Sequence, residues 1–309
     1  MNRARRTFLR VAGAALSLAA LKFKQGLADP LGIHIGLQLY TVYPELEKDF
    51  EGTLKRIAEI GIREVELLEF PNRSPADVRR ALTNAGLHAI SIHLGGDDLV
   101  SEPQKQIDLA AAMGVTYLIC PGPLTSPAAR SRPDFAGAEG SLEAFIRFVS
   151  TMTLDDWRWN ADVFNTVGER ARKAGIQFGY HNHSTEFRRL DGRVAYDELL
   201  VRTDPQWVTF EMDCGWVESS RASAADYLRR YPGRFQLLHI KDIKRRADPG
   251  VELRMESTEV GSGIIDWKSL FAVAPRAGVK HYFIEQEPPF ERPALESVRL
   301  SYDWLHAFR

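Results

Sequence analysis

The stretch AGIQFGYHNH, residues 174–183, contains the pattern that decides the fold. A small residue and a glycine, which suit the left-handed turn at the end of a helix, precede a run of strand-forming residues. The pattern recurs as IGIREVELLEF (60–70), AGLHAISIHLG (85–95), MGVTYLICPG (113–122) and AGVKHYFIEQE (277–287). Helix, glycine and strand therefore alternate along the chain.

Amphipathic stretches come before several of these patterns and predict helices. Examples are FEGTLKRIAEIG (50–61), SPADVRRALTNAG (74–86), where Ser74 caps a helix that starts at Pro75, and WNADVFNTVGERARKAG (159–175). Three further strands are expected in IHIGLQLYTV (33–42), WVTFEMDCGW (207–216) and RFQLLHIKDI (234–243). Eight strands alternating with helices predict an α/β fold, a single (β/α)8 TIM barrel. An open doubly wound sheet is the rival, but no G-x-G-x-x-G follows the first strand.

The first 28 residues are predicted to be a twin-arginine-type signal peptide, which leaves 29–309 as the barrel. They combine a basic start, the run RRTFLR (5–10), a short apolar stretch and a small-residue GLA. The apolar stretch, residues 11–21, has about half of the roughly 20 residues that span a bilayer, so no stable membrane span is expected. The alternative is a frayed basic terminus. We expect an exported, periplasmic protein.

The charge balance argues against a nucleic-acid partner. Without residues 1–28, which hold six basic and no acidic residues, the 40 basic residues fall to 34 against 41 acidic ones. An acidic body does not suit a phosphate backbone. Two cysteines, Cys120 and Cys214, are too few for a disulfide framework and are expected to be buried free thiols.

Polar residues collect where the predicted strands end, the face on which barrel enzymes place their active sites. YHNHSTEF (180–187) alone could be a metal site, a proton relay or a polar strand end. The full set is Gln38, Tyr40, His93, His181, His183, Glu211, Asp213, His239, Lys241, Glu285 and Glu287. Such crowded carboxylates and imidazoles would be costly to bury unpaired, and one divalent ion, Mn²⁺, Zn²⁺, Co²⁺ or Mg²⁺, would resolve that cost.

Five phrases carry a resemblance: YHNHSTEF (180–187), FEMDCGW (210–216), LLHIKD (237–242), VGSGIIDW (260–267) and IEQE (284–287). On these the chain resembles the sugar phosphate isomerase/epimerase superfamily, the xylose isomerase-like barrels that include inosose dehydratases and endonuclease IV. The resemblance implies one divalent ion held from strands five to eight. Asp213, His239 and Glu285 match three of its ligands. In VGSGIIDW, Ser262 stands where relatives often carry an acidic residue, and the loop is expected to pack near the rim.

The fourth ligand does not transfer, because the epimerases' strand-five Glu falls at or near Gly179. Glu186 is our predicted ligand, with His181 next and otherwise facing the substrate. The resemblance further implies chelation of a hydroxyl and a carbonyl oxygen and stabilisation of an enediolate. Glu285 and His183 are then the candidate bases.

Other residues are assigned by position. Lys241 would stabilise negative charge or bind a hydroxyl, or else form an ion pair. Gln38 and His93 would line the mouth for a substrate. Trp216, like Trp157 and Trp159, could stack on a sugar ring or pack in the core.

These residues predict a metal-dependent sugar isomerase or epimerase acting on a free sugar or keto-sugar. The alternatives are a lyase or hydratase that acts on 3-keto-glycosides by β-elimination, and a non-catalytic sugar-binding barrel. The acidic charge and the shortage of histidine ligands disfavour a DNA-repair nuclease. A small-molecule sugar is the expected partner, and a homo-oligomer is left open.

Overall fold

The computed structural model describes residues 29–132, 142–246 and 255–309. Eight parallel strands close into a barrel in the order β1-β12-β9-β8-β5-β4-β3-β2. They are β1 (Ile35–Gln38), β2 (Glu64–Leu67), β3 (His88–His93), β4 (Tyr117–Cys120), β5 (Gln177–His181), β8 (Val208–Asp213), β9 (Phe235–Ile240) and β12 (His281–Ile284). The predicted TIM barrel is confirmed. The predicted signal peptide, residues 1–28, lies outside the described residues, as do 133–141 and 247–254.

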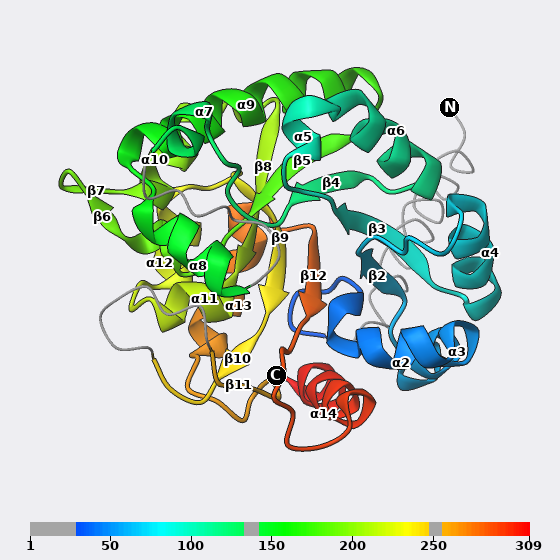
Figure 1. Ribbon diagram of the computed structural model, residues 1–309. Coiled ribbons are helices and arrows are strands. Elements are labelled where there is room, and N and C mark those ends of the chain that lie inside the picture. The colour runs from blue at the N-terminus through cyan, green and yellow to red at the C-terminus, as the bar shows by residue number, and fades with distance from the viewer. Residues whose placement is uncertain (1–28, 133–141, 247–254) are drawn as a thin grey trace, which may run out of the picture.

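Helices surround the barrel on its outside (Figure 1). They are α2 (Tyr43–Lys48), α3 (Phe50–Ile60), α4 (Pro75–Ala85), α5 (Asp98–Ser101), α6 (Pro103–Met113), α7 (Pro127–Arg130), α8 (Leu142–Thr151), α9 (Leu154–Lys173), α10 (Ala195–Arg202), α11 (Cys214–Ser219), α12 (Ala224–Arg230), α13 (Trp267–Ala277) and α14 (Ala294–Ala307). Short elements complete the chain: the 3-10 helices η2 (Leu39–Val42) and η3 (Thr185–Phe187), and the two-stranded sheets β6 (Arg189–Leu190) with β7 (Arg193–Val194) and β10 (Asp242–Ile243) with β11 (Ser257–Thr258).

The helix predictions hold, with one difference in a boundary. Ser74 caps α4 as expected, because its side chain accepts a hydrogen bond from the backbone N–H of Asp77. Helix α9 begins several residues earlier than its apolar pattern indicated. Thr153 and Asp156 form a reciprocal capping box there, which satisfies two backbone donors at the start of the helix.

The interior of the barrel changes from apolar to polar along the strands. Tyr117, Ile119, Leu237 and Phe283 form a separate buried cluster inside the barrel. Because strand side chains alternate between faces, the next inward residue on β9 after Leu237 is His239. An apolar layer therefore closes the barrel below the polar rim.

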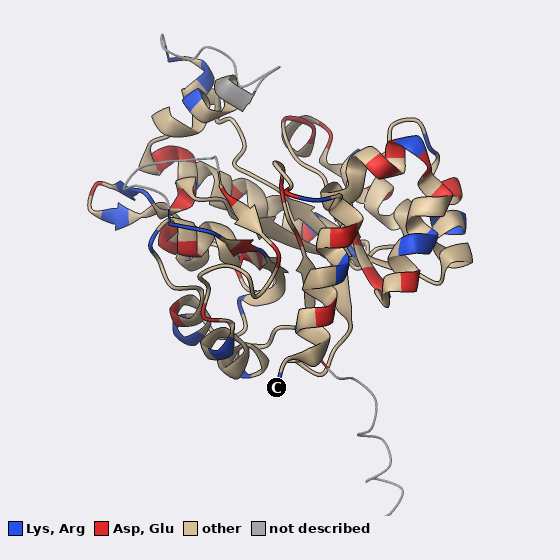
Figure 2. Ribbon diagram, turned by 90° about the horizontal axis from the view of Figure 1, so that it is seen from below, with Lys and Arg blue, Asp and Glu red and all other residues tan. Residues whose placement is uncertain are grey.

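The outer surface carries mixed charge, and the thiols are inside. Acidic and basic side chains are interspersed over the outer helices (Figure 2). Cys120 and Cys214 are free and buried, as predicted. Within the described residues, no helix has both the length and the apolar character needed to cross a membrane.

The Gly-rich loop before α13 is held to the barrel by one carboxylate. Asp242 Oδ2 accepts hydrogen bonds from the backbone N–H groups of Gly261 (2.9 Å) and Gly263 (3.2 Å) and from Trp267 Nε1 (2.8 Å). Gly261 has a φ of +85°, the left-handed region that favours glycine. Because Asp242 directly follows Lys241, the loop is fixed beside the rim.

Candidate metal centre

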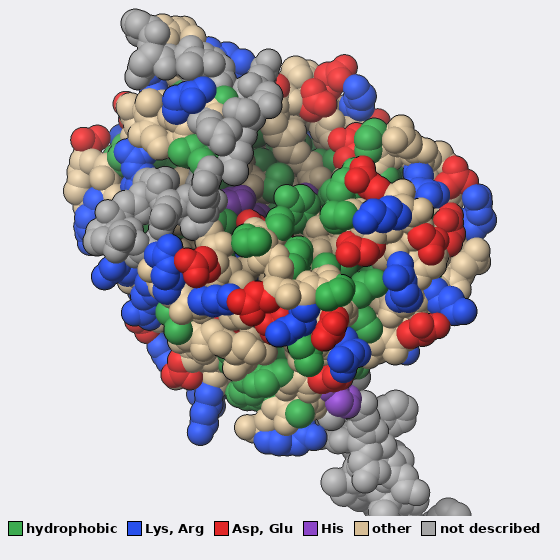
Figure 3. Space-filling view, turned by 60° about the horizontal axis from the view of Figure 1, so that its bottom comes forward, with side chains coloured by type: hydrophobic (Ala, Val, Ile, Leu, Met, Phe, Trp, Pro, Cys, Tyr) green, Lys and Arg blue, Asp and Glu red, His purple; other side chains and the backbone are tan. Residues whose placement is uncertain are grey.

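The polar residues predicted at the strand ends meet at one end of the barrel. The strands β5, β8, β9 and β12 are neighbours, and their register pairs His181 with Glu211 and Asp213 with His239. Glu285 follows the last residue of β12 directly. The face toward which the arrows of β9 and β12 point is hollowed, with histidine side chains visible inside (Figures 1 and 3).

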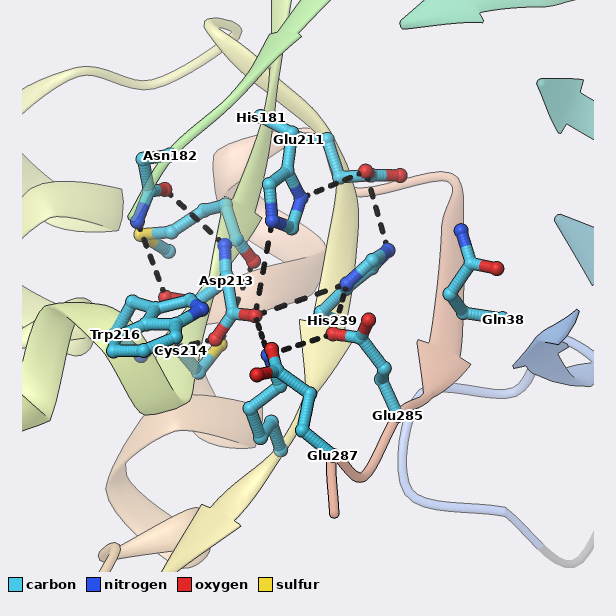
Figure 4. A network of polar contacts seen from close by, with 12 residues as sticks. Gln38, His181, Asn182, Glu211, Asp213, Cys214, Trp216, His239, Glu285 and Glu287 are labelled. Atoms are coloured by element: carbon cyan, nitrogen blue, oxygen red, sulfur yellow. Dashed lines mark hydrogen bonds and ion pairs between the residues drawn. The ribbon is translucent and has the colours of Figure 1, made fainter. Parts of the chain in front are cut away.

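Asp213, His239 and Glu285 form a candidate metal site. Their donor atoms all lie within 4.8 Å of one another, and all three residues are buried. His239 Nδ1 lies 2.8 Å from Glu285 Oε2 and 3.8 Å from Asp213 Oδ2 (Figure 4). Two carboxylates and an imidazole suit Mn²⁺, Zn²⁺ or Co²⁺. The donor set therefore fits the divalent ion that the sequence predicted.

His181 supplies a further nitrogen to this group. It is the last residue of β5, it is 3% exposed, and its Nε2 lies 3.9 Å from Asp213 Oδ2. In Figure 4 the His181 ring points toward Asp213 and His239. Of the two residues considered for the strand-five ligand, His181 is the one that lies beside Asp213 and His239; the two histidine ring centroids are 4.5 Å apart.

Glu186 does not reach this group, and our preference for it as a ligand is not supported by the geometry. Its Oε1 accepts hydrogen bonds from Tyr180 Oη (2.7 Å) and the backbone N–H of His183 (2.9 Å). Its Oε2 accepts one from Thr185 Oγ1 at 2.7 Å. The carboxylate turns back under the strand end because these local donors satisfy it there. Glu186 thus holds the turn that carries His183.

Lys241 sits among the carboxylates of the site. Its Nζ lies 2.8 Å from Asp213 Oδ2, 2.8 Å from Glu285 Oε2 and 2.6 Å from Glu287 Oε1, and its side chain is fully buried. Burial alone would lower the pKa of Lys241, but the charges of Asp213, Glu285 and Glu287 raise it well above its ordinary value. Burial would likewise raise the pKa of Glu285, yet Lys241 and His239 hold it well below its usual range. An ammonium facing carboxylates is the stable state here.

A second polar group lies behind the candidate ligands. His93, His181, Glu211 and His239 also have donor atoms within 4.8 Å of one another. Glu66, which the sequence analysis did not single out, joins them: its Oε1 lies 2.7 Å from His239 Nε2 and 2.9 Å from His93 Nε2. The available signal was the run EVEL of β2, in which Glu64 and Glu66 alternate with apolar residues.

Gln38 and His93 differ in their access to the hollow. Gln38 is 1% exposed, and its Nε2 donates to Glu66 Oε1 at 2.9 Å while its Oε1 accepts from the backbone N–H of Tyr40. It therefore holds Glu66 in place, contrary to its predicted position at the mouth. The His93 side chain is 14% exposed, so it is the one of the two that can meet a ligand.

His183 and Trp216 form one wall beside Lys241. Their ring centroids lie 5.4 Å apart, and Lys241 Nζ lies 5.2 Å from the Trp216 ring. Neither His183 Nδ1 nor Trp216 Nε1 has a hydrogen-bond partner in the described part of the chain. Burial lowers the pKa of His183, so its ring is neutral at pH 7. Trp157, in contrast, packs into the hydrophobic core, and Trp159 packs against it.

Comparison with known proteins gives a family and several relatives. Residues 54–308 match the family described as xylose isomerase-like TIM barrel. An inosose dehydratase from Lacticaseibacillus casei is 30% identical over 157 residues, which are 45% of this chain and 52% of that protein. An inosose dehydratase from Geobacillus thermodenitrificans is 26% identical over 156 residues, 46% of this chain and 51% of that protein. The chain spans about half the length of the curated relatives it matches.

Solved structures share the fold over most of the chain. A sugar phosphate isomerase/epimerase from Parabacteroides distasonis superposes with a TM-score of 0.72 and 25% identity, covering 92% of this chain and 96% of that one. A structure described as the IOLI protein with a binding zinc atom gives a TM-score of 0.65 over 89% of this chain and 98% of that one. At 12% identity, the second likeness concerns the fold alone.

Proposed function

Because the chain belongs to the xylose isomerase-like TIM barrel family, we propose that it is a metal-dependent lyase for keto-sugars or related keto-polyols. The reaction would remove a leaving group from the carbon β to a carbonyl. The relatives named inosose dehydratase support elimination, since a dehydratase removes water from its substrate. Although the sequence motifs favoured an isomerase, these relatives move elimination to first place.

One observation carries the proposal: donor atoms from four neighbouring strands converge on the hollowed face. Asp213, His239 and Glu285 have donor atoms within 4.8 Å of one another, and His181 Nε2 lies 3.9 Å from Asp213 Oδ2. A divalent ion held there would act as a Lewis acid toward the substrate's carbonyl oxygen and an adjacent hydroxyl. That polarisation would acidify the C–H beside the carbonyl.

The residues beside this group can carry the proton transfers. We assign removal of the proton from the carbon next to the carbonyl to a neutral His183, whose Nδ1 has no partner among the described residues. We assign to the charged Lys241 the stabilisation of negative charge that develops on the oxygen leaving from the β carbon. One C–H and one C–O bond break and a C=C bond forms; His183 passes the proton it takes to solvent, and solvent protonates the leaving oxygen.

The charge of the site favours an unphosphorylated substrate. Lys241 already lies within ion-pair distance of Asp213, Glu285 and Glu287, so its ammonium adds no excess positive charge. A phosphate would meet carboxylates in this place. An exported protein, as the first 28 residues suggest, would also meet free sugars and glycosides. We propose a periplasmic location on that sequence argument.

Isomerisation or epimerisation is the second candidate. The 25% identical sugar phosphate isomerase/epimerase covers 92% of this chain, which supports it. The superfamily's epimerases use two opposed carboxylate bases, whereas the strand-five place of one of them falls at or near Gly179 in this chain, and we propose the imidazole of His181 as the strand-five ligand. This difference favours elimination over epimerisation.

The test is a substrate panel in deuterated water followed by NMR. The purified protein is incubated with Mn²⁺ and with aldoses, ketoses, inososes and 3-keto-glycosides. We expect a new C=C bond and a released alcohol or water from a keto substrate. Deuterium incorporated next to a carbonyl without loss of a group would instead identify the isomerase. No reaction across the panel, by a protein that binds Mn²⁺, would favour the sugar-binding barrel.

A further inference from the structure

Two buried carboxylates, Glu66 and Glu211, stand on the far side of the candidate ligands His181 and His239; we call them the backing carboxylates. Both are 0% exposed. His181 turns Nε2 toward Asp213 (3.9 Å) and Nδ1 toward Glu211 Oε2 (3.0 Å). His181 thus has one ring nitrogen on the side of the metal site and the other on the side of the backing carboxylates.

His239 shows the same division with its nitrogens exchanged. Its Nδ1 lies 2.8 Å from Glu285 Oε2, whereas its Nε2 lies 2.7 Å from Glu66 Oε1 and 3.2 Å from Glu211 Oε2. Glu211 Oε2 is therefore close to both candidate ligand histidines. The position follows from the barrel, because β8 lies between β5 and β9.

The hydrogen bonds of Glu211 are concentrated on one oxygen. Its Oε2 is within hydrogen-bond distance of His93 Nε2 (2.9 Å) and His181 Nδ1 (3.0 Å) and lies 3.2 Å from His239 Nε2, while its Oε1 has no partner among the described residues. Burying a carboxylate is energetically costly unless hydrogen-bond donors or positive charges compensate its charge. An imidazole N–H that donates to a carboxylate is fixed in tautomer and ring orientation, and its other nitrogen becomes a better ligand.

We propose that Glu211 is a positioning residue that orients His181 and His239 together, so that one carboxylate sets two metal ligands. This inference rests on the metal site of the proposed function. A second ion among His93, Glu66 and Glu211 is the competing arrangement. A neutral imidazole has a single acceptor nitrogen, so neither His181 nor His239 can serve ions on both sides.

The test compares divalent-ion binding in the wild type, Glu211→Gln and Glu64→Gln. Glu64 is a matched control because it also pairs with a histidine: its Oε2 lies 2.8 Å from His281 Nδ1. Both are the first residues of their strands, so the pair lies at the end of the barrel away from the rim. Affinity for Mn²⁺ and Co²⁺ is measured by chelator competition, stoichiometry by elemental analysis, and ligand geometry by the Co²⁺ visible spectrum.

We expect Glu211→Gln to weaken binding about 10- to 100-fold and to alter the Co²⁺ spectrum, with Glu64→Gln unchanged. Glu211→Asp keeps the charge on a side chain one carbon shorter and is expected to weaken binding less. It replaces Glu211→Gln in the test if that variant fails to fold. Wild-type affinity and spectrum in both Glu211 variants would overturn the inference alone. Two ions in the wild type, one lost in Glu211→Gln, would overturn it in favour of a second site. No ion in the wild type would overturn both this inference and the proposed function.

Discussion

Lys241 Nζ lies 2.8 Å from Asp213 Oδ2, inside the same group of carboxylates that is placed to hold a metal ion. The buried ammonium therefore balances negative charge that a cation would otherwise balance. We expect two consequences of this position: the ammonium stabilises the folded protein without metal, and it would lie next to the substrate of the proposed reaction.

Replacing the ammonium should expose its contribution to stability. We expect Lys241→Met to lower the free energy of unfolding in EDTA by about 3 to 5 kcal/mol, because three carboxylates lose their partner. Added Mn²⁺ should recover more stability in the variant than in the wild type, since the ion restores the missing positive charge. Urea unfolding with and without Mn²⁺ measures both effects.

The control for that variant is Lys244→Met. Lys244 pairs with Glu291 at the surface, where their side chains are 38% and 61% exposed, so its loss should change the free energy of unfolding far less than the loss of Lys241. Equal stability of Lys241→Met and the wild type in EDTA would contradict the role given to this ammonium.

His181 and Glu186 should behave differently when each is replaced by Gln. His181→Gln is expected to weaken divalent-ion binding, because it removes a nitrogen on the metal side. Glu186→Gln should keep the ion but lower the free energy of unfolding by about 1 to 3 kcal/mol. The amide nitrogen of Gln cannot accept a hydrogen bond, so a buried donor that bonds to the carboxylate is left unpaired. Metal content and thermal unfolding separate the two. Loss of the ion in Glu186→Gln alone would restore Glu186 as the ligand.

His183 is expected to matter for turnover and not for the metal. His183→Asn should lower kcat of the elimination reaction by about 100- to 10,000-fold, because it removes the base. The metal content should stay at the wild-type value. His306→Asn, on the exposed face of α14, is the control and should keep full activity. An unchanged kcat in His183→Asn would transfer the base to another residue, with Glu285 the next to test.

Much of the fold and part of the site could be predicted because both depend on local pattern. The glycines that end helices mark where strands begin, so the alternation of elements is readable in the sequence. Asp213 and His239 could be expected together because each is the last or next-to-last residue of a neighbouring strand. Position in a parallel barrel is enough to bring such residues to one rim.

The rest of the site depends on contacts that sequence spacing does not contain. Glu66 meets His239 across 173 residues of chain, and the alternation of glutamates and apolar residues in β2 does not show that its carboxylate lies among histidines. Glu186 lies away from the candidate ligands for a different reason. The direction of a carboxylate after a strand end depends on which local donors capture it, here Tyr180 and Thr185.

Anomalous diffraction from a crystal of the protein soaked with Mn²⁺ or Zn²⁺ tests the proposed metal site most directly. We expect one strong peak bounded by His181, Asp213, His239 and Glu285, with Lys241 moved away from Asp213 and Glu285 toward Glu287. No peak at the carboxyl end of the barrel, or an ion held by Glu186 without His181, would contradict it.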